Sequence, residues 1–401
     1  MFKSWRPLLV VLFAALLAAG CHGITAGPPA PANNQNPPAP KLKITETSLG
    51  KVGEGYVEDS LRGSPDMRHA AWVVKHGGKQ AVVVDGVEGK EYDYIVNYSL
   101  VFSPDSKRVA YTAKRGQKWL AVVDGVEGKE YDGIGFGTPV FSPDSKRVAY
   151  AAKRGEKWFV VVDGVEGKEY DGICIGTPVF SPDSKRVAYT AIRGDKKLVV
   201  VDGVEGKEYD RFTGPPVFSP DSKRVAYAAM HGEKLLVVVD GVEGKEYDSI
   251  VTNPTFSPDS NHLAYTASRW DKWLLVLDGA EGKEYDDIGE GPVFSPDSKR
   301  LTYCAQRQRE ENGKWFVVVD GVEGKEYDWL SSLVFSPDSK RLTYCAQRGE
   351  NWLVVVDGIE GKEQYDGVLK GSSLVFDSPT KLRILMVRDG EIFLVEIEIT
   401  E

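Results

Sequence analysis

The chain has 401 residues and a formal net charge of −9, from 50 lysines and arginines against 59 aspartates and glutamates. This sign disfavours nucleic acid as a partner, because nucleic-acid binding depends on neutralising phosphates with cationic side chains. No CxxC pair or Cys/His cluster indicates a zinc site, and none of the five histidines lies in a nucleophile motif such as G-x-S-x-G. We therefore expect neither a bound metal nor a cofactor.

The N-terminus is typical of an exported protein. A positively charged start precedes an apolar run from Leu8 to Ala19, which is too short for an ordinary membrane span. The sequence Leu17-Ala18-Ala19-Gly20-Cys21 resembles a bacterial lipobox, with the leucine one position further from the cysteine than usual. We predict that residues 1–21 are a signal peptide and that Cys21 carries the lipid. The alternative is ordinary cleavage nearby, with Cys21 incidental.

Residues 22–41 are rich in proline and poor in side chains that could form a core. This composition favours an extended, semi-rigid tether, which would reach about 60 Å at ~3.1 Å per residue. Such a tether would hold a globular part clear of a membrane surface. We assign residues 42–401 to that part, and we expect one domain because repeats fill most of it.

One phrase is repeated along the rest of the chain. F-S-P-D occurs at intervals of 38 to 41 residues, and each copy is followed by D-G-V-E-G-K-E-Y-D or a near-copy of it. The phenylalanines that open the phrase are Phe102, Phe141, Phe180, Phe218, Phe256, Phe294 and Phe335. Self-similarity at this period indicates one repeated supersecondary unit, each copy too small to bury its own apolar face.

Each unit contains four short apolar runs. In the first close copy the runs are Val101-Phe102, Arg108–Ala113, Trp119–Val123 and Lys129–Asp132. The Ser-Pro-Asp-Ser and Asp-Gly phrases between the runs are turn signals. Because runs of four to six residues are too short for helices and lack a helical period, we expect four antiparallel strands per unit, with the polar fourth strand outermost.

The third run predicts how the units pack. Val160–Val162 does not alternate with polar residues, so both faces of this strand should be covered. Sheets stacked between like neighbours meet that condition, and a ring of such sheets is a β-propeller, in which about 40 residues per blade is usual. A linear solenoid is the alternative, but it needs polar capping repeats at its ends.

The two ends of the repeat region look complementary. A degenerate first unit has Gly63-Ser64-Pro65-Asp66 in place of F-S-P-D, and the final unit, Ser373–Glu401, has three predicted strands instead of four. The segment Leu42–Thr47 alternates like a half-buried strand. We predict that this segment completes the final sheet and closes a ring of nine blades. Eight blades is the alternative if the degenerate first unit does not form an independent blade.

The repeated sequence motifs also resemble those of a known family. F-S-P-D-S-K-R-V-A-Y, followed by an apolar strand that ends in Asp-Gly, is similar to the WD-like, Pro-Asp-type repeat of TolB-family β-propellers. The resemblance covers roughly residues 56–399 and implies the propeller fold. The long D-G-V-E-G-K-E-Y-D motif differs from the usual sequence of that family at this place. It indicates a distinct branch, to which the role of TolB does not transfer directly.

Three cysteines, Cys174, Cys304 and Cys345, lie in the repeats. Cys304 and Cys345 occupy the same place in successive units. A disulfide needs Cα atoms within about 7 Å, and equivalent positions on neighbouring blades usually lie farther apart. We expect three buried thiols that pack as small hydrophobes.

The units differ most in the links between them and in the loops between their second and third strands. These loops carry arginines, several of them followed by tryptophans, and the loop Gln306–Lys314 is about four residues longer than its counterparts. The candidate residues are Arg115, Arg154, Arg193, Arg269, Arg307, Arg348, Trp119, Trp158 and Trp315. Since arginine and tryptophan are enriched at binding hot spots, we predict that this variable face recognises a partner. The alternative is that these side chains pack and pair along blade edges, and that the variation is drift.

Together these patterns favour a non-enzymatic, lipid-anchored propeller that acts as a binding or scaffolding module in the cell envelope, with a protein partner. The alternative function is a polysaccharide-directed hydrolase or lyase, in which acids such as Asp287 and Glu290 act near the channel mouth. A glycosidase needs two carboxylates about 5 to 9.5 Å apart in different environments. The links between units offer few matching acids.

Overall fold

The computed structural model describes residues 48, 55–66, 68–135, 139–250, 253–289, 291–307, 313–369, 372–389 and 391–399. The predicted signal peptide with Cys21, the tether and the predicted strand Leu42–Thr47 lie outside these residues. The chain divides into two units, Met1–Thr47 and Ser48–Glu401, and the fold described below is that of the second. Within the described ranges, no helix is both long and apolar enough to cross a membrane.

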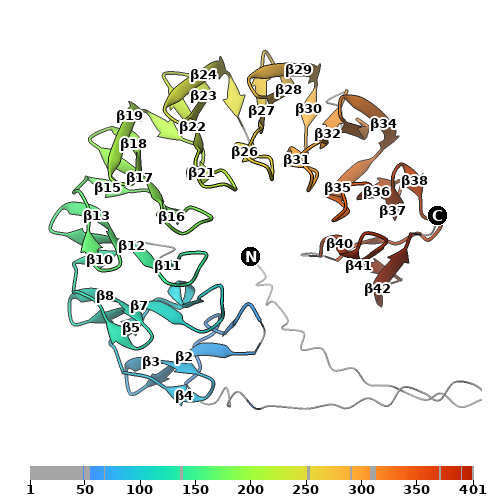
Figure 1. Cartoon of the computed structure of the whole chain (residues 1–401). Helices are drawn as coiled ribbons and strands as arrows, with labels where there is room; N and C mark the ends of the chain where they lie inside the picture. The colour runs from blue at the N-terminus through green and yellow to red at the C-terminus, as the bar shows by residue number, and fades with distance from the viewer. Residues whose placement is uncertain are drawn as a thin grey trace, which may run out of the picture. The chain divides into compact units, whose positions relative to one another are not determined.

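The described residues form nine antiparallel sheets, which we number 1 to 9 in chain order (Figure 1). Sheet 1 contains β1 (Arg62–Gly63), β2 (Ala70–His76), β3 (Lys79–Val84) and β4 (Val87–Glu88). Sheet 2 contains β5 (Tyr94–Ile95), the 3-10 helix η1 (Asn97–Ser99), β6 (Val101–Phe102), β7 (Val109–Arg115), β8 (Lys118–Val123) and β9 (Val126–Glu127). Sheet 3 contains β10 (Gly133–Ile134), β11 (Val140–Phe141), β12 (Val148–Arg154), β13 (Lys157–Val162) and β14 (Val165–Glu166).

The next three sheets repeat this arrangement. Sheet 4 contains β15 (Gly172–Ile173), β16 (Val179–Phe180), β17 (Val187–Arg193), β18 (Lys196–Val201) and β19 (Val204–Tyr209). Sheet 5 contains β20 (Arg211–Phe212), β21 (Val217–Phe218), β22 (Val225–His231), β23 (Lys234–Val239) and β24 (Val242–Tyr247). Sheet 6 contains β25 (Ser249–Ile250), β26 (Thr255–Phe256), β27 (Leu263–Arg269), β28 (Lys272–Leu277) and β29 (Ala280–Tyr285).

The last three sheets differ in detail. Sheet 7 contains β30 (Asp287–Ile288), β31 (Val293–Phe294), β32 (Leu301–Gln306), β33 (Trp315–Val319) and β34 (Val322–Tyr327). Sheet 8 contains β35 (Trp329–Phe335), β36 (Leu342–Arg348), β37 (Asn351–Val356) and β38 (Ile359–Glu360). Sheet 9 contains β39 (Gly367–Val368), β40 (Val375–Ser378), β41 (Lys381–Arg388) and β42 (Glu391–Glu398).

Each complete sheet has the four-stranded plan predicted from the repeats. In sheet 3 the first strand is split into β10 and β11, which both pair with β12, and β13 and β14 follow in order. In sheet 8 the two halves are joined in β35, which shifts register between Ser331 and Val334. The all-β fold is thus a succession of antiparallel, blade-like sheets, as in a β-propeller.

The hydrophobic core lies between successive sheets. Val160 and Val161 are adjacent in β13 and point to opposite faces, and both are buried. Val161 packs with Tyr131 and other side chains between sheets 2 and 3. Val160 packs with Leu198 and others between sheets 3 and 4. Both faces of the third strand are therefore covered, which explains why its valines do not alternate with polar residues.

The fourth strand differs from its predicted limits. It begins directly after the Asp-Gly turn, as β19 does at Val204 and β9 does at Val126. In sheets 4 to 7 it continues to the tyrosine of the phrase, whereas in sheet 2 it stops at Glu127 and Tyr131 pairs with Trp119 as an isolated bridge. The aspartate that follows the tyrosine belongs to the next sheet, since the Asp210 amide donates to the carbonyl of Met230 in β22. The predicted strand therefore started too late and ended too far along.

Sheet 9 has a first strand in two parts, then β41 and β42, in agreement with the three strands predicted for the final unit. Within the described residues, nothing pairs with the outer edge of β42, and no strand of sheet 1 pairs with a strand of sheet 9. Closure of a ring therefore stays a prediction.

Candidate functional site: the interfaces between sheets

The Ser-Pro-Asp-Ser turn connects successive sheets from sheet 1 to sheet 8. Ser142 donates from Oγ to Asp144 Oδ1 at 2.6 Å, and its Oγ accepts the Arg147 amide at 3.0 Å. The Asp144 amide then donates to Oγ of Ser184, in the next sheet's turn, at 2.9 Å. Ser184 has φ +66°, a left-handed conformation that serine seldom adopts. Its hydroxyl explains why serine and not glycine stands there. The corresponding pairs are Asp66–Ser106, Asp105–Ser145, Asp183–Ser222, Asp221–Ser260, Asp259–Ser298 and Asp297–Ser339.

The arginine after this turn makes a second connection, which we call the arginine clip. Arg147 donates from Nε to Asp163 Oδ2 of its own sheet at 2.8 Å. Its Nη1 donates to the carbonyls of Ser184 and Lys185 in the next sheet at 3.1 and 2.9 Å. The guanidinium also lies 5.3 Å from the ring centroid of Phe180. Arg108 and Arg186 make the same set of contacts.

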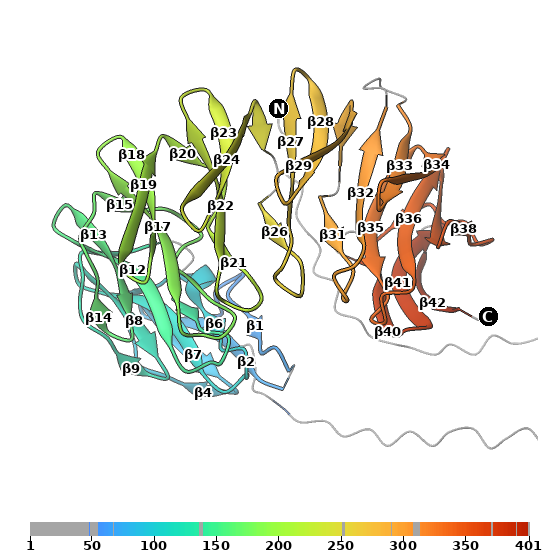
Figure 2. The ribbon, with the colours of Figure 1, turned by 45° about the horizontal axis from the view of Figure 1, so that its top comes forward.

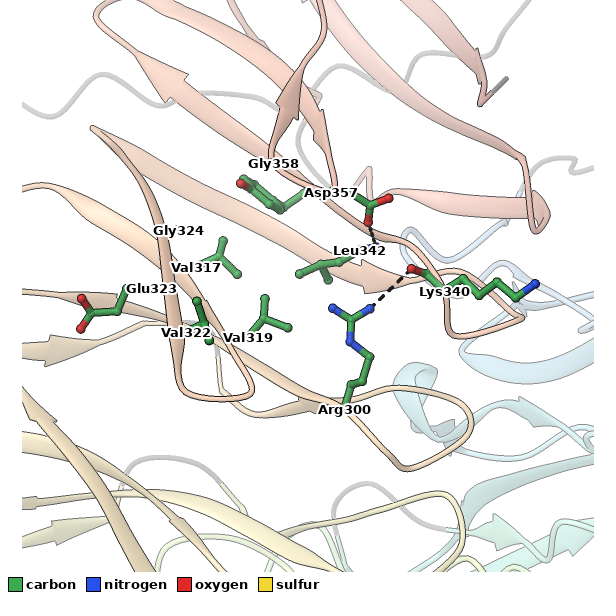
Figure 3. Close-up of a pocket in the computed structure, with 11 residues that line it drawn as sticks. Arg300, Val317, Val319, Val322, Glu323, Gly324, Lys340, Leu342, Asp357 and Gly358 are labelled. Carbon is green, nitrogen blue, oxygen red and sulfur yellow. Dashed lines mark hydrogen bonds between the residues drawn. The ribbon is translucent and has the colours of Figure 1, made fainter. Parts of the chain in front are cut away.

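Slots open between sheets beside two of these arginines, Arg108 and its counterpart Arg300. Between sheets 7 and 8 the volume of the slot is about 390 Å³, with Val319 and Val322 on one wall and Leu342 on the other (Figure 3). Arg300 extends across it and donates to the Lys340 carbonyl at 3.5 Å. The corresponding slot between sheets 2 and 3 measures about 330 Å³. The slots therefore recur with the repeat.

The glutamate of D-G-V-E-G-K-E-Y-D forms a third connection, which we call the glutamate latch. Glu166 accepts hydrogen bonds from Arg154 of its own sheet at 2.7 and 3.0 Å, and from the Tyr131 hydroxyl of the preceding sheet at 3.1 Å. Lys129 of the preceding sheet lies 3.4 Å away. The Arg154 guanidinium, more than any other neighbour, lowers the pKa of Glu166 to about 2. Burial raises the pKa of Tyr131, which therefore stays a neutral donor.

All six arginines predicted to bind a partner are latch arginines. Each pairs with the glutamate in the fourth strand of its own sheet and is about one-third to one-half exposed. The pairs are Arg115–Glu127, Arg154–Glu166, Arg193–Glu205, Arg269–Glu281, Arg307–Glu323 and Arg348–Glu360. These contacts connect sheets. A role in partner recognition stays a prediction.

The predicted tryptophans are half-buried beside the links. Trp119 lies edge-on to Tyr94, with ring centroids 6.2 Å apart, and Trp315 lies edge-on to Trp329 at 5.6 Å. Trp158 lies close to the backbone at Gly133 and Gly135. Their rings therefore pack against residues of the variable links. Most of the predicted long loop, residues 308–312, lies outside the described residues.

A fourth connection lies at the loops between second and third strands. Asp132 accepts from Lys118 Nζ of sheet 2 at 2.6 Å and from the Gly155 amide of sheet 3 at 2.7 Å. Gly155 has φ +58°, and Gly116, Gly194, Gly232 and Gly349 occupy the same place with similar φ. Figure 2 shows these hairpin ends, such as β22–β23, on the opposite side from the turns that follow β21, β26 and β31. The two sides predicted from the repeat are therefore present.

Trp270 breaks this pattern, and the sequence reasoning missed it. It stands where six other units have glycine, at φ +52°, and its amide makes the same hydrogen bond, to Asp248 at 2.9 Å. In sheet 9 the small polar Asp389 occupies this place at the same φ. Its side chain is 82% exposed. The signal was present in the sequence as Arg-Trp-Asp-Lys in place of Arg-Gly-x-Lys.

The other candidates are dispersed. Asp287 lies in β30, where its carboxylate accepts the amide of Ile288, whereas Glu290 lies outside the described residues. Cys304 and Cys345 are buried and Cys174 is half-buried, and none of the three forms a disulfide. Among the residues that the structure describes, no three His, Cys, Asp or Glu side chains are placed to hold a metal ion.

Comparisons with known proteins add little. No family model matches the sequence, and no curated protein matches it. Solved structures that are similar include TolB from Acinetobacter baumannii, at 18% identity over 56% of this chain and 61% of that chain, with a TM-score of 0.27. The β-propeller domain of the Trilobed protease from Pyrococcus furiosus matches at 16% identity over 56% and 82%, with a TM-score of 0.33. A eukaryotic initiation factor matches at 11% identity over 80% and 90%, with a TM-score of 0.46.

These matches are distant, so the fold assignment depends on the sheets of this chain, and membership of the TolB family stays a prediction.

The glutamate latch predicts how stability depends on pH. Because the pKa of Glu166 is lower in the folded state, its stabilisation is present above the unfolded pKa of about 4.3 and is lost as the pH falls towards 2. Glu166→Gln should therefore lower the free energy of unfolding at pH 7 by about 1 kcal/mol, and the difference from wild type should shrink progressively as the pH falls from about 4.3 to 2. Urea unfolding across this range measures it, with the exposed Glu156→Gln as control. A difference that is as large at pH 2 as at pH 7 would contradict the assignment.

Proposed function

We propose that the protein is a non-enzymatic binding module of the cell envelope and that its variable face recognises a protein partner around Trp270. The observation that carries this proposal is the conformation of Trp270. It combines a left-handed backbone with a side chain that is almost fully exposed. Both features are unfavourable for the isolated protein, whereas glycine serves at this place in other units.

The backbone conformation of Trp270 has an energetic cost. A left-handed conformation costs a residue with a Cβ about 1 to 2 kcal/mol, and a bulky side chain there is a genuine outlier. Strain of this kind is found at functional sites. Tryptophan is also the side chain that most often anchors an interface, where burial of its ring offsets the cost. Trp270 is therefore best explained by contact with another molecule.

The residues around Trp270 also favour this face as the site of partner binding. In the preceding sheet, His231 replaces the latch arginine, and Glu243 accepts hydrogen bonds from Lys207 and Tyr209 of sheet 4. Further along this face, large apolar side chains of the links are also exposed. They are Tyr98, Ile175 and Trp329. The opposite side, in contrast, carries the nearly identical turns.

Replacement of Trp270 should separate stability from binding. Trp270→Gly restores the glycine of six other units, so the melting temperature should stay the same or rise by about 1 to 3 °C as strain is relieved. Affinity for the partner should fall roughly thirtyfold, since loss of a hot-spot side chain costs about 2 kcal/mol. Partner capture from envelope extract, followed by Kd measurement with the purified partner, tests this.

Val204→Ala, which removes an exposed apolar side chain from the other side, is the matched control. Undiminished capture by Trp270→Gly would contradict the proposal.

The envelope location depends on the N-terminal pattern. The lipobox-like residues before Cys21 and the proline-rich stretch after it support a lipid anchor with a tether. Cys21→Ser should move the protein from the membrane fraction to soluble or unprocessed forms, which fractionation and mass spectrometry of the N-terminal peptide measure. An unchanged membrane fraction with no lipid on that peptide would count against the anchor.

We also propose that the sheets close into a nine-bladed ring. Fourth strands elsewhere carry Val-Glu-Gly-Lys-Glu-Tyr, and charged residues and glycine suit an edge strand because they discourage further pairing. The unpaired edge of β42 is instead rich in apolar residues, with Ile392 and Leu394 exposed. The alternating segment Leu42–Thr47 is the occupant we propose for this edge.

Deletion of residues 42–48 should therefore uncover the edge of β42. We expect the melting temperature to fall by several degrees, because a few kcal/mol of strand burial is lost from a marginally stable fold. An equally long deletion within the tether, residues 30–36, should leave the melt unchanged. If both deletion variants have the melting temperature of the full chain, closure does not use this segment.

A further inference from the structure

Two of the described interfaces have a histidine in place of the clip arginine: His69 stands there in sheet 1 and His262 in sheet 6. At the end of the turn in sheet 6, His262 stands where Arg147 and its counterparts stand, and its Nδ1 lies 2.7 Å from Asp278 Oδ2. This contact reproduces the bond that the arginine Nε makes to its own sheet. The imidazole has no equivalent of the Nη1 group, which elsewhere reaches the next sheet.

The acceptors of the missing group are still in place. In three other interfaces, those of Arg108, Arg147 and Arg186, Nη1 donates to two carbonyls in the next turn, at 2.8 to 3.1 Å. Their equivalents opposite His262 are the carbonyls of Ser298 and Lys299. Among the described residues no donor reaches either carbonyl, and no cation lies over the ring of Phe294. Sheet 7 therefore has the two acceptor carbonyls and the aromatic ring that a clip arginine contacts elsewhere, but no guanidinium of the described residues lies against them.

The slot is also larger here. Its volume is about 500 Å³, against about 390 Å³ between sheets 7 and 8. Ala280 occupies the place of the valine that borders the other slots, such as Val322. Phe294 and Ser298 line the enlarged slot, whereas their counterparts Phe335 and Ser339 do not line the slot that Arg300 crosses. Two substitutions far apart in the unit, at positions 262 and 280, thus open the same space.

The charges around the slot are compatible with a cation. The Asp278 carboxylate faces His262 and the backbone amide of Leu263. Two nearby cationic side chains are already paired, Lys283 with Glu323 and Arg300 with Asp320. Lys299 is exposed, and the backbone carbonyl of its counterpart Lys185 accepts from the guanidinium of Arg147 in an occupied interface. The same surroundings therefore accommodate a guanidinium elsewhere in this chain.

We propose that the slot between sheets 6 and 7 binds the guanidinium group of an arginine side chain from another polypeptide. The incoming group donates to the carbonyls of Ser298 and Lys299 and stacks on Phe294, as Arg147 does on Phe180. This site is independent of Trp270, so its failure and the failure of the proposed partner face are distinguishable.

The test uses the capped peptide acetyl-Gly-Arg-Gly-amide as the probe, measured by ligand-observed NMR titration of the full-length protein at pH 8. Peptides with lysine or citrulline in place of arginine are the matched controls, since lysine lacks the planar fork and citrulline lacks the charge. We expect the arginine peptide to bind at least tenfold more tightly than either. Equal binding of the citrulline peptide would overturn the proposal.

Two variants locate the site. His262→Arg restores the clip arginine, so its own guanidinium should occupy the slot, and affinity for the arginine peptide should fall at least tenfold. Ala280→Val should narrow the slot and weaken binding severalfold. His69→Arg makes the same exchange in sheet 1, where His69 pairs with Asp85, and should leave binding at the sheet 6 slot unchanged.

Wild-type affinity in both His262→Arg and Ala280→Val would overturn the assignment. Tighter binding of free arginine than of the capped peptide would identify an amino-acid site instead and would overturn the choice of a polypeptide partner.

Discussion

The structure depends on one constraint: a four-stranded sheet of this sequence cannot bury both of its faces by itself. Val160 and Val161 are buried on opposite sides of one strand, and each needs a different neighbouring sheet. Apolar burial of this kind is the main favourable term in folding. Every sheet is therefore stable only as a member of a stack, and the contacts between sheets determine the rest of the design.

The polar residues of the repeat follow from this constraint. Apolar packing is not directional, so it does not by itself fix how two sheets are aligned. The serine hydroxyls, the arginine clips, the glutamate latches and the aspartates at the other end are directional, and each connects one sheet to the next. They hold the interface at both ends and at its outer margin. Invariance of the turn phrases within the chain is thus explained by alignment of sheets, without any catalytic role.

The sequence was sufficient to predict the sheets, because turn phrases and short apolar runs are local signals. It also predicted which loops lie together on each side. What it did not predict is the partner of each charged side chain. Arg154 was nominated from its loop position, but its guanidinium reaches the fourth strand and Tyr131 of the preceding sheet, a contact that depends on packing between units. Trp270 and His262 were overlooked because their significance lies in the backbone conformation or the contact that they replace.

The contacts between sheets have a consequence for how such a chain can change over generations. Each interface is formed by the trailing half of one unit and the leading half of the next, as in the contact between Tyr131 and Glu166. A recombination event that adds or removes one whole unit therefore recreates every interface with its correct partners. Only the spacing between the two ends of the stack is altered. A chain of this kind can lengthen or shorten in single steps, while exchanges such as arginine to histidine at position 262 give individual interfaces separate identities.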